Sequence, residues 1–156
     1  MADDDLEDRL MTERAFKTNR LANDLRFVGD GRELMDYLRH DGGYTDANAP
    51  RPGLILLDLN MPRKDGRTAL GEIKADPGLR CIPVVVLTTS RDEEDVLQSY
   101  GLGVNSFITK PVTFKGLVEA IGALGVYWLE IVQLPPTKPQ GEAHAQDDAE
   151  HPADRR

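Results

Sequence analysis

A few acidic residues and one lysine stand where their side chains could act together. The acidic run Asp3–Asp5 lies near the start of the chain, Asp58 ends its most apolar segment, and Lys110 follows a shorter apolar segment. Crowded carboxylates repel and shift one another's pKa values unless a cation lies among them. Hard oxygen ligands favour magnesium or manganese. If these positions meet in the fold, they predict a divalent metal site, with Mg²⁺ as the expected cofactor.

The same residues suit phosphoryl chemistry. A carboxylate such as Asp58 can attack a phosphoryl group and become a mixed anhydride when a cation and a nearby ammonium neutralise the transferring oxygens. Lys110 can supply the ammonium. The hydroxyl of Thr88 can hydrogen-bond a phosphoryl oxygen and so report whether Asp58 is modified. The residues therefore predict a phosphoacceptor aspartate with a sensor hydroxyl.

A repeating pattern of apolar segments predicts the scaffold for these side chains. Apolar runs predict strands over 25–28, 54–59, 83–88 and 105–109. Apolar residues at helical spacing predict helices over 6–19, 31–40, 68–74, 92–100 and 112–134. Strands that alternate with helices pair in parallel through right-handed crossovers. We therefore expect an α/β fold with a doubly wound, parallel five-stranded sheet and a functional crevice at the carboxyl ends of its strands.

The start of the chain conflicts with a complete sheet. A doubly wound sheet opens with an apolar strand, but only Met1 and Ala2 precede the acidic run. We therefore predict a truncated first strand. Either residues are missing upstream, for example through a misplaced start codon, or the protein has a weakened central strand, which is costly in unpaired backbone and lost packing.

Length and composition bound the class of protein. The 156 residues suit one domain, expected over 1–134, and the acidic, Pro-rich segment 135–156 is expected to be a disordered tail. A net charge of −8 argues against sequence-independent binding to nucleic acid or anionic membranes. No run reaches the roughly 18 apolar residues of a membrane span, and no signal-peptide pattern opens the chain. With lone Cys81 expected to be a packed thiol, these features predict a cytoplasmic protein.

Four motifs in a fixed order make the chain resemble the response-regulator receiver family. They are the acidic run at 3–5, Leu-Leu-Asp-Leu-Asn-Met-Pro at 56–62 with Asp-Gly at 65–66, Val-Leu-Thr-Thr at 86–89, and Phe-Ile-Thr-Lys-Pro at 107–111. Four motifs with near-constant gaps are more specific than any one alone. The resemblance spans about residues 1–134 and implies the flavodoxin-like, or CheY-like, form of the α/β fold.

The resemblance implies a role for each matching residue in phosphoryl transfer. Asp58 becomes the phosphoacceptor and a metal ligand, and Lys110 becomes the phosphate-binding cation. Thr88 becomes the switch hydroxyl, and Phe107 occupies the switch-aromatic position.

The resemblance also implies a ligand set for the metal. Asp4 and the backbone carbonyl of Asn60 become ligands beside the phosphoacceptor, and Asp3 becomes the second member of the acidic pair, acting indirectly. The registration of this pair stays open, because three aspartates run together. Asp5 can equally be a helix N-cap, and Asp8 can simply favour a helix N-terminus electrostatically.

A narrower resemblance suggests a partner. Arg-Pro at 51–52, the segment 82–90 and the ending Tyr-Trp-Leu-Glu-Ile-Val-Gln-Leu-Pro at 127–135 look like single-domain regulators paired with bacterial phytochrome histidine kinases. The implied partner is a histidine kinase of phytochrome type. A histidine phosphotransfer protein and a homodimer are further partners that the sequence leaves open.

Three functions compete for this pattern. The predicted one is a single-domain response regulator, not an enzyme apart from slow self-dephosphorylation, which is phosphorylated on Asp58 and signals through protein contacts or phosphorelay. A metal-dependent aspartyl phosphohydrolase needs a general acid two residues after the nucleophile, where the neutral amide of Asn60 stands. The third is an adaptor whose truncated first strand has cost it phosphorylation. Metal binding distinguishes the adaptor from the switch.

Overall fold

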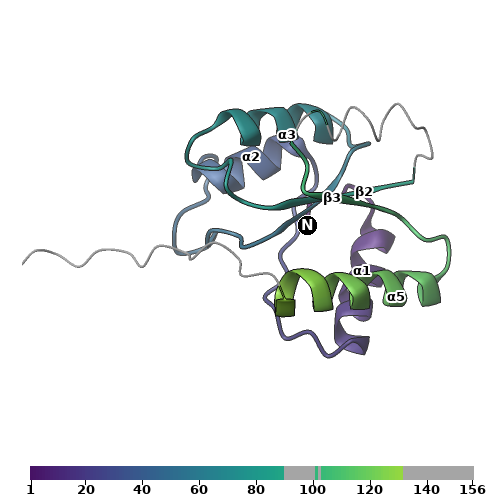
Figure 1. Ribbon diagram of the computed structural model, residues 1–156. Coiled ribbons are helices and arrows are strands. Elements are labelled where there is room, and N and C mark those ends of the chain that lie inside the picture. The colour runs from purple at the N-terminus through teal and green to yellow at the C-terminus, as the bar shows by residue number, and fades with distance from the viewer. Residues whose placement is uncertain (90–100, 102, 132–156) are drawn as a thin grey trace, which may run out of the picture.

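The computed structural model describes residues 1–89, 101 and 103–131, which form a parallel sheet with helices on both faces (Figure 1). Its strands are β1 (Ile55–Asp58), β2 (Val84–Thr88) and β3 (Ser106–Thr109), paired in that order. One face is covered by α2 (Gly31–Arg39) and α3 (Gly66–Ala75), and the other by α1 (Leu6–Thr18) and α5 (Phe114–Leu124). The predicted α/β fold with a doubly wound parallel sheet is confirmed.

Alternating side chains of the strands enter two separate apolar layers. Ile55 and Leu57 of β1 belong to the cluster beneath α2 and α3, whereas Leu56 lies with Phe16 of α1 and Ile121 of α5. Successive side chains of a strand point to opposite faces, so both faces of β1 are buried. This double burial explains the continuous apolar run and fixes the backbone that ends in Asp58.

Isolated bridges take the place of the first two predicted strands. Ala2 bridges Val28 on one side and Leu57 on the other, both in parallel. The strand predicted over 25–28 is therefore wrong except at Val28, because its neighbour begins at Met1 and offers too little backbone to pair with. The described residues hold three strands rather than five. The predicted truncation of the first strand agrees with its single bridged residue.

Side-chain caps set where the helices begin. The caps accept hydrogen bonds from backbone N–H groups in the first turns of α1, α2, α3 and α5, and they are Asp5, Asp30, Asp65 and Thr113. Such caps satisfy donors that have no partner inside the helix. The predicted helices over 6–19, 31–40 and 68–74 are confirmed. Their ends differ from the prediction by no more than two residues.

The helix predicted over 112–134 has a different form. It begins only at Phe114 and passes into a π-helix, η1 (Gly125–Ile131). A Cβ atom on Gly125 would lie 2.9 Å from a Leu21 methyl group, so the start of η1 lies in close contact with the Leu21 side chain. A wider helical turn next to a close contact is a local adjustment that apolar periodicity does not reveal.

Cys81 is exposed, so the prediction of a packed thiol is wrong. The turn that contains it leads into β2, and the residues of this segment that are buried are Leu79 and Ile82, on either side of Cys81.

Two predictions fall on residues that the structure does not describe, namely the helix over 92–100 and the tail over 135–156. None of the helices in the described ranges is long and apolar enough to cross a membrane.

Candidate functional site

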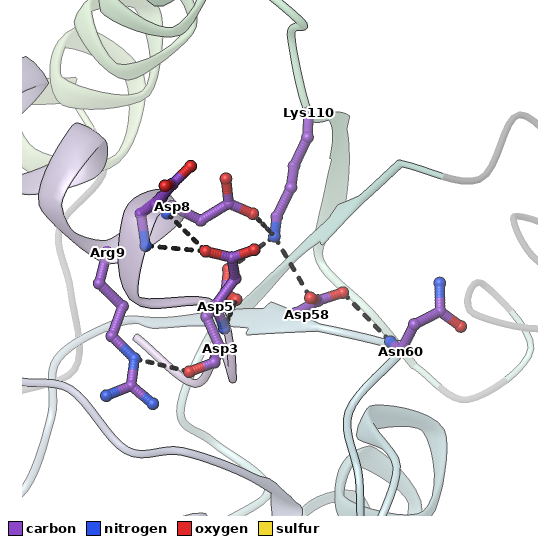
Figure 2. A network of polar contacts seen from close by, with 8 residues as sticks. Asp3, Asp5, Asp8, Arg9, Asp58, Asn60 and Lys110 are labelled. Atoms are coloured by element: carbon purple, nitrogen blue, oxygen red, sulfur yellow. Dashed lines mark hydrogen bonds and ion pairs between the residues drawn. The ribbon is translucent and has the colours of Figure 1, made fainter.

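Three segments that are distant in sequence meet at the carboxyl edge of the sheet (Figure 2). Asp3 follows the Ala2 bridge, Asp58 ends β1, and Lys110 follows β3. Lys110 Nζ lies 2.6 Å from Asp3 Oδ2, 2.7 Å from Asp8 Oδ2 and 3.2 Å from Asp58 Oδ2. The predicted convergence of Asp3, Asp58 and Lys110 is therefore present as one hydrogen-bonded cluster.

The start of α1 fixes the acidic run. Asp5 is the N-cap of α1 and accepts hydrogen bonds from the backbone N–H groups of Glu7 and Asp8. Asp3 is fully buried, and its Oδ1 accepts from the Asp5 N–H at 2.9 Å. The Asp3 carbonyl accepts from Arg9 Nε at 2.7 Å. Asp5 thus caps α1, whereas Asp3 binds Lys110 in the cluster.

Burial makes the charges of this cluster costly. Asp58 is 7% exposed, and burial raises the pKa of its carboxyl, although Lys110 and the Asn60 N–H act in the opposite direction. Burial also pulls the pKa of Lys110 down. Hydrogen bonds to Asp3 and Asp8 and the charge of Asp58 outweigh it and hold that pKa above its usual value. Lys110 therefore stays charged, while the Asp58 carboxylate remains incompletely compensated.

The uncompensated charge suits a cation. Carboxylate oxygens of Asp3, Asp4 and Asp58 lie within 4.8 Å of one another. Asp3 already accepts hydrogen bonds through both of its oxygens. Asp4 is exposed, and no residue of the described ranges donates a hydrogen bond to its carboxylate. The donor set is made of hard oxygens, so these residues fit a hard divalent cation.

The loop after β1 is anchored from α2. Asp30, which is fully buried at the start of α2, pairs with the guanidinium of Arg63. The Gly31 N–H donates to the Lys64 carbonyl at 2.9 Å. These contacts hold the loop whose Asn60 N–H donates to Asp58 Oδ1 at 3.1 Å. Nothing in the sequence pattern indicated this anchor.

The two predicted switch residues lie on neighbouring strands. Thr88 is the last residue of β2 and pairs with Thr109 of β3, one residue before Lys110. Phe107 of β3 is partly buried against the apolar cluster beneath α2 and α3. Their positions are compatible with a switch pair, whose operation stays a prediction.

Asp8 is a member of the cluster that the sequence analysis did not assign to the site. Its side chain is 39% exposed and contacts the Lys110 ammonium. The sequence did contain one indication of this role. With Asp5 as the N-cap, Asp8 lies in the first turn of α1, close in sequence to Asp3. The distance across to Lys110, however, depends on how α1 packs on the sheet.

The fold and the cluster together define a class of protein. It is an α/β protein whose parallel sheet presents an acidic pocket and a buried lysine at its carboxyl edge. Residues 1–122 match the family model for the response regulator receiver domain. The chain belongs to the response regulator receiver family.

Several response regulators are similar to this chain. Response regulator Rcp1 of Synechocystis sp. is 44% identical over 135 residues, which are 86% of this chain and 90% of Rcp1. The structure of Mn(2+)-bound Rcp1 gives a TM-score of 0.79 and covers 86% of this chain and 96% of Rcp1.

Two further structures support the same likeness. The phosphorylated cyanobacterial phytochrome response regulator RcpA is 44% identical, with a TM-score of 0.80 over 86% of this chain and 95% of RcpA. A response regulator in red light signaling of R. palustris is 35% identical, with a TM-score of 0.82 over 87% of this chain and 96% of that protein. The predicted resemblance to phytochrome response regulators is confirmed.

The raised pKa of Asp58 predicts a pH-dependent effect on stability. When a folded-state pKa lies above the unfolded value, the group stabilises the fold at low pH, and this contribution is lost as the pH rises through the folded-state pKa. In metal-free buffer, Asp58→Asn should therefore raise the melting temperature at neutral pH. The gain should shrink as the pH falls toward 3.8, the ordinary value of the carboxyl.

Thermal melts of both proteins in EDTA across this pH range check the prediction. Glu119→Gln, which removes a carboxylate whose side chain is 70% exposed on α5, is the matched control and should show no such trend. A lower melting temperature for Asp58→Asn at neutral pH would contradict the inferred cost of the Asp58 charge.

Proposed function

We propose that this protein is a phosphorylation switch in which Asp58 accepts a phosphoryl group from a histidine kinase. The proposal rests chiefly on Lys110 Nζ, which lies 3.2 Å from Asp58 Oδ2 and 2.6 Å from Asp3 Oδ2. An ammonium anchored on one buried carboxylate and reaching a second is placed to bind an oxygen of a phosphoryl group attached to the second.

The transfer step follows from ordinary acyl phosphate chemistry. A carboxylate oxygen of Asp58 forms a bond to phosphorus, while the bond from phosphorus to the kinase histidine breaks. The electron pair of the broken bond returns to the imidazole nitrogen, which then takes a proton. Lys110 and the Asn60 N–H, which both contact Asp58 in the resting state, hold the carboxylate in position.

The acidic residues would hold a divalent cation, proposed as Mg²⁺. Asp4, Asp58 and the backbone carbonyl of Asn60 would be its ligands, and Asp3 would act indirectly because both of its oxygens are engaged. A bound cation neutralises charge on the phosphoryl oxygens during transfer. The Mn(2+)-bound form of Rcp1 supports a divalent cation in a similar protein.

Similar proteins suggest the partner. The relatives that are named phytochrome response regulators support a histidine kinase of phytochrome type as the donor. The output we propose is a protein contact changed through Thr88 and Phe107, or phosphorelay to a histidine phosphotransfer protein, with homodimerisation as a further contact. The acidic net charge is consistent with protein partners in the cytoplasm.

The same geometry disfavours the two alternatives. A hydrolase of aspartyl type needs a general acid near the leaving group, and the Asn60 side chain is a neutral amide. A pure adaptor has no need of a buried lysine that hydrogen-bonds both the acidic run and Asp58. Lys110 makes these hydrogen bonds to Asp3 and Asp58 although Ala2 is the one bridged residue of the first strand.

Incubation of the full chain with Mg²⁺ and acetyl phosphate tests the proposal. Intact mass spectrometry should show a gain of one phosphoryl group in the unaltered protein and in Glu119→Gln. The gain should be absent in Asp58→Asn and in unaltered protein treated with EDTA. A folded protein that binds Mg²⁺ without any mass gain would contradict the switch.

A further inference from the structure

The Lys110 ammonium has as many carboxylate acceptors as it has donors. An ammonium offers three N–H donors. Lys110 Nζ lies 2.6 Å from Asp3 Oδ2, 2.7 Å from Asp8 Oδ2 and 3.2 Å from Asp58 Oδ2, and Figure 2 shows these side chains gathered around it. The contact to Asp8 is thus among the two shortest, although Asp8 lies on α1 and belongs to neither the acidic run nor a strand end.

A phosphoryl group on Asp58 would change which anions face this ammonium. It would turn the Asp58 carboxylate into a neutral acyl oxygen and add roughly −1.5 to −2 charges on the phosphoryl oxygens. Two acceptors of one Nζ, each at about 2.7 Å, lie no more than about 5.5 Å apart. If Asp8 kept its contact with Lys110, its carboxylate would therefore repel the phosphoryl group at short range.

The three carboxylates differ in the cost of losing Lys110. The Asp3 side chain has no exposed surface and that of Asp58 has 10%, whereas that of Asp8 has 39%. A buried carboxylate without its cation is left unsolvated, but an exposed one is hydrated by water. Asp8 is therefore the partner that Lys110 can leave at the lowest cost.

The position of Asp8 in α1 allows this release. Its backbone N–H donates to the Asp5 cap at 3.3 Å, so the main chain is held at the start of the helix. Rotation about the side-chain torsions can carry the carboxylate into solvent without moving α1. Asp3 is held differently, because its second oxygen accepts from the Asp5 N–H at 2.9 Å. Lys110 can thus keep Asp3 while it exchanges Asp8.

We propose that Asp8 is a positioning residue, which restrains Lys110 in the resting protein and is displaced from it when Asp58 carries a phosphoryl group. This inference rests on the proposed function. Asp8 forms no bond to phosphorus, and hydrogen bonds from water replace the one that Lys110 gives up. Because its contact and its charge both oppose loading, Asp8 slows phosphoryl uptake and weakens binding of the group.

The restraint is separate from the proposed metal site. Among the described residues, the carboxylates that come together closely enough to hold a cation are those of Asp3, Asp4 and Asp58. Asp8→Asn leaves all three in place. The amide oxygen of asparagine can still accept from Lys110, so this substitution removes the charge and keeps the shape of the side chain.

Asp8→Asn and Glu7→Gln test the inference as a matched pair. Each removes one carboxylate from the first turn of α1, but of the two residues Asp8 is the one that contacts Lys110. At saturating Mg²⁺, the initial rate of phosphoryl uptake from acetyl phosphate should be at least about threefold higher in Asp8→Asn than in Glu7→Gln. Intact mass spectrometry measures this rate. A variant that was merely damaged would take up the group more slowly.

Binding of beryllofluoride, a mimic of the phosphoryl group, gives a second measurement without turnover. Calorimetric titration at saturating Mg²⁺ should show at least about threefold tighter binding to Asp8→Asn than to Glu7→Gln. Asp8→Glu restores the carboxylate and should return the rate and the affinity toward those of the unaltered protein.

The outcomes separate this inference from the function on which it rests. Equal rates and equal affinities for Asp8→Asn and Glu7→Gln, with uptake by the unaltered protein, would overturn the restraint by Asp8 and leave the switch intact. Neither uptake nor beryllofluoride binding in any of the folded proteins would overturn the proposed function, and the restraint with it.

Discussion

Replacing Lys110 by Met is expected to destabilise the metal-free protein by about 3–5 kcal/mol. Met keeps much of the apolar stem but removes the ammonium, which contacts Asp3, Asp8 and Asp58. Asp3 has no exposed side-chain surface and the Asp58 side chain has 10%, so both would be left as buried carboxylates with their cation removed. Denaturant unfolding in EDTA measures the loss.

The same change should slow phosphoryl uptake by at least about 100-fold, the usual effect of removing a group that stabilises developing charge. Uptake from acetyl phosphate is followed by intact mass spectrometry without denaturant, at a temperature at which the variant is folded. Lys115→Met is the matched control, since its side chain is 89% exposed and 4.0 Å from Glu119. The control should change stability by less than about 0.5 kcal/mol. Equal stabilities of the two variants would refute the role given to Lys110.

Gly66→Ala should cost about 2–4 kcal/mol of stability, because the added methyl group has no space. A Cβ atom at Gly66 would overlap the Asp58 carbonyl oxygen and lie 2.8 Å from Leu59 Cα, and both neighbours are backbone atoms that cannot rotate away. The backbone that positions Asp58, the proposed phosphoacceptor, must therefore shift, and phosphoryl uptake should fall with stability. Denaturant unfolding and mass spectrometry measure the two effects.

Gly71→Ala supplies the control in the same helix. A Cβ atom on Gly71 would meet nothing within 4 Å, so alanine should stabilise α3 by about 0.5–1 kcal/mol through its higher helix propensity. Opposite signs for the two substitutions are the expected result. A similar small gain at both positions would show that the close approach of α3 to β1 is not required.

The arrangement of the site could be predicted because it follows from strand ends. Asp58 and Lys110 each come directly after an apolar run, and parallel strands bring their carboxyl ends to one edge. The N-cap reading of Asp5 was available from residue type alone. The sequence pattern therefore located Lys110, Asp58 and the acidic run without any knowledge of their distances.

The features that escaped prediction depend on packing between elements. Asp8 reaches Lys110 because α1 lies across the strand ends, and Arg63 reaches buried Asp30 because α2 abuts the loop after β1. The π-helix η1 begins at Gly125, where the chain lies close to the Leu21 side chain. None of these leaves a periodic signal, since each joins residues from separate helices or loops.

The shortness of the first strand affects the segment 25–28, which lies beside it. The run 25–28 has the composition of a strand, yet only Val28 is bridged because Ala2 is the one bridged residue beside it. Strand propensity is expressed only when a partner strand supplies backbone groups to pair with.

The most direct test of the central claim is to locate the phosphoryl group on the chain. Protein treated with Mg²⁺ and acetyl phosphate is reduced with borohydride, which converts an aspartyl phosphate to the corresponding alcohol, and is then mapped by peptide mass spectrometry. We predict reduction at position 58 and at no other aspartate, with no reduction in Asp58→Asn. Reduction at Asp3, Asp4 or Asp8, or at no residue of a folded, Mg²⁺-bound protein, would contradict Asp58 as the phosphoacceptor.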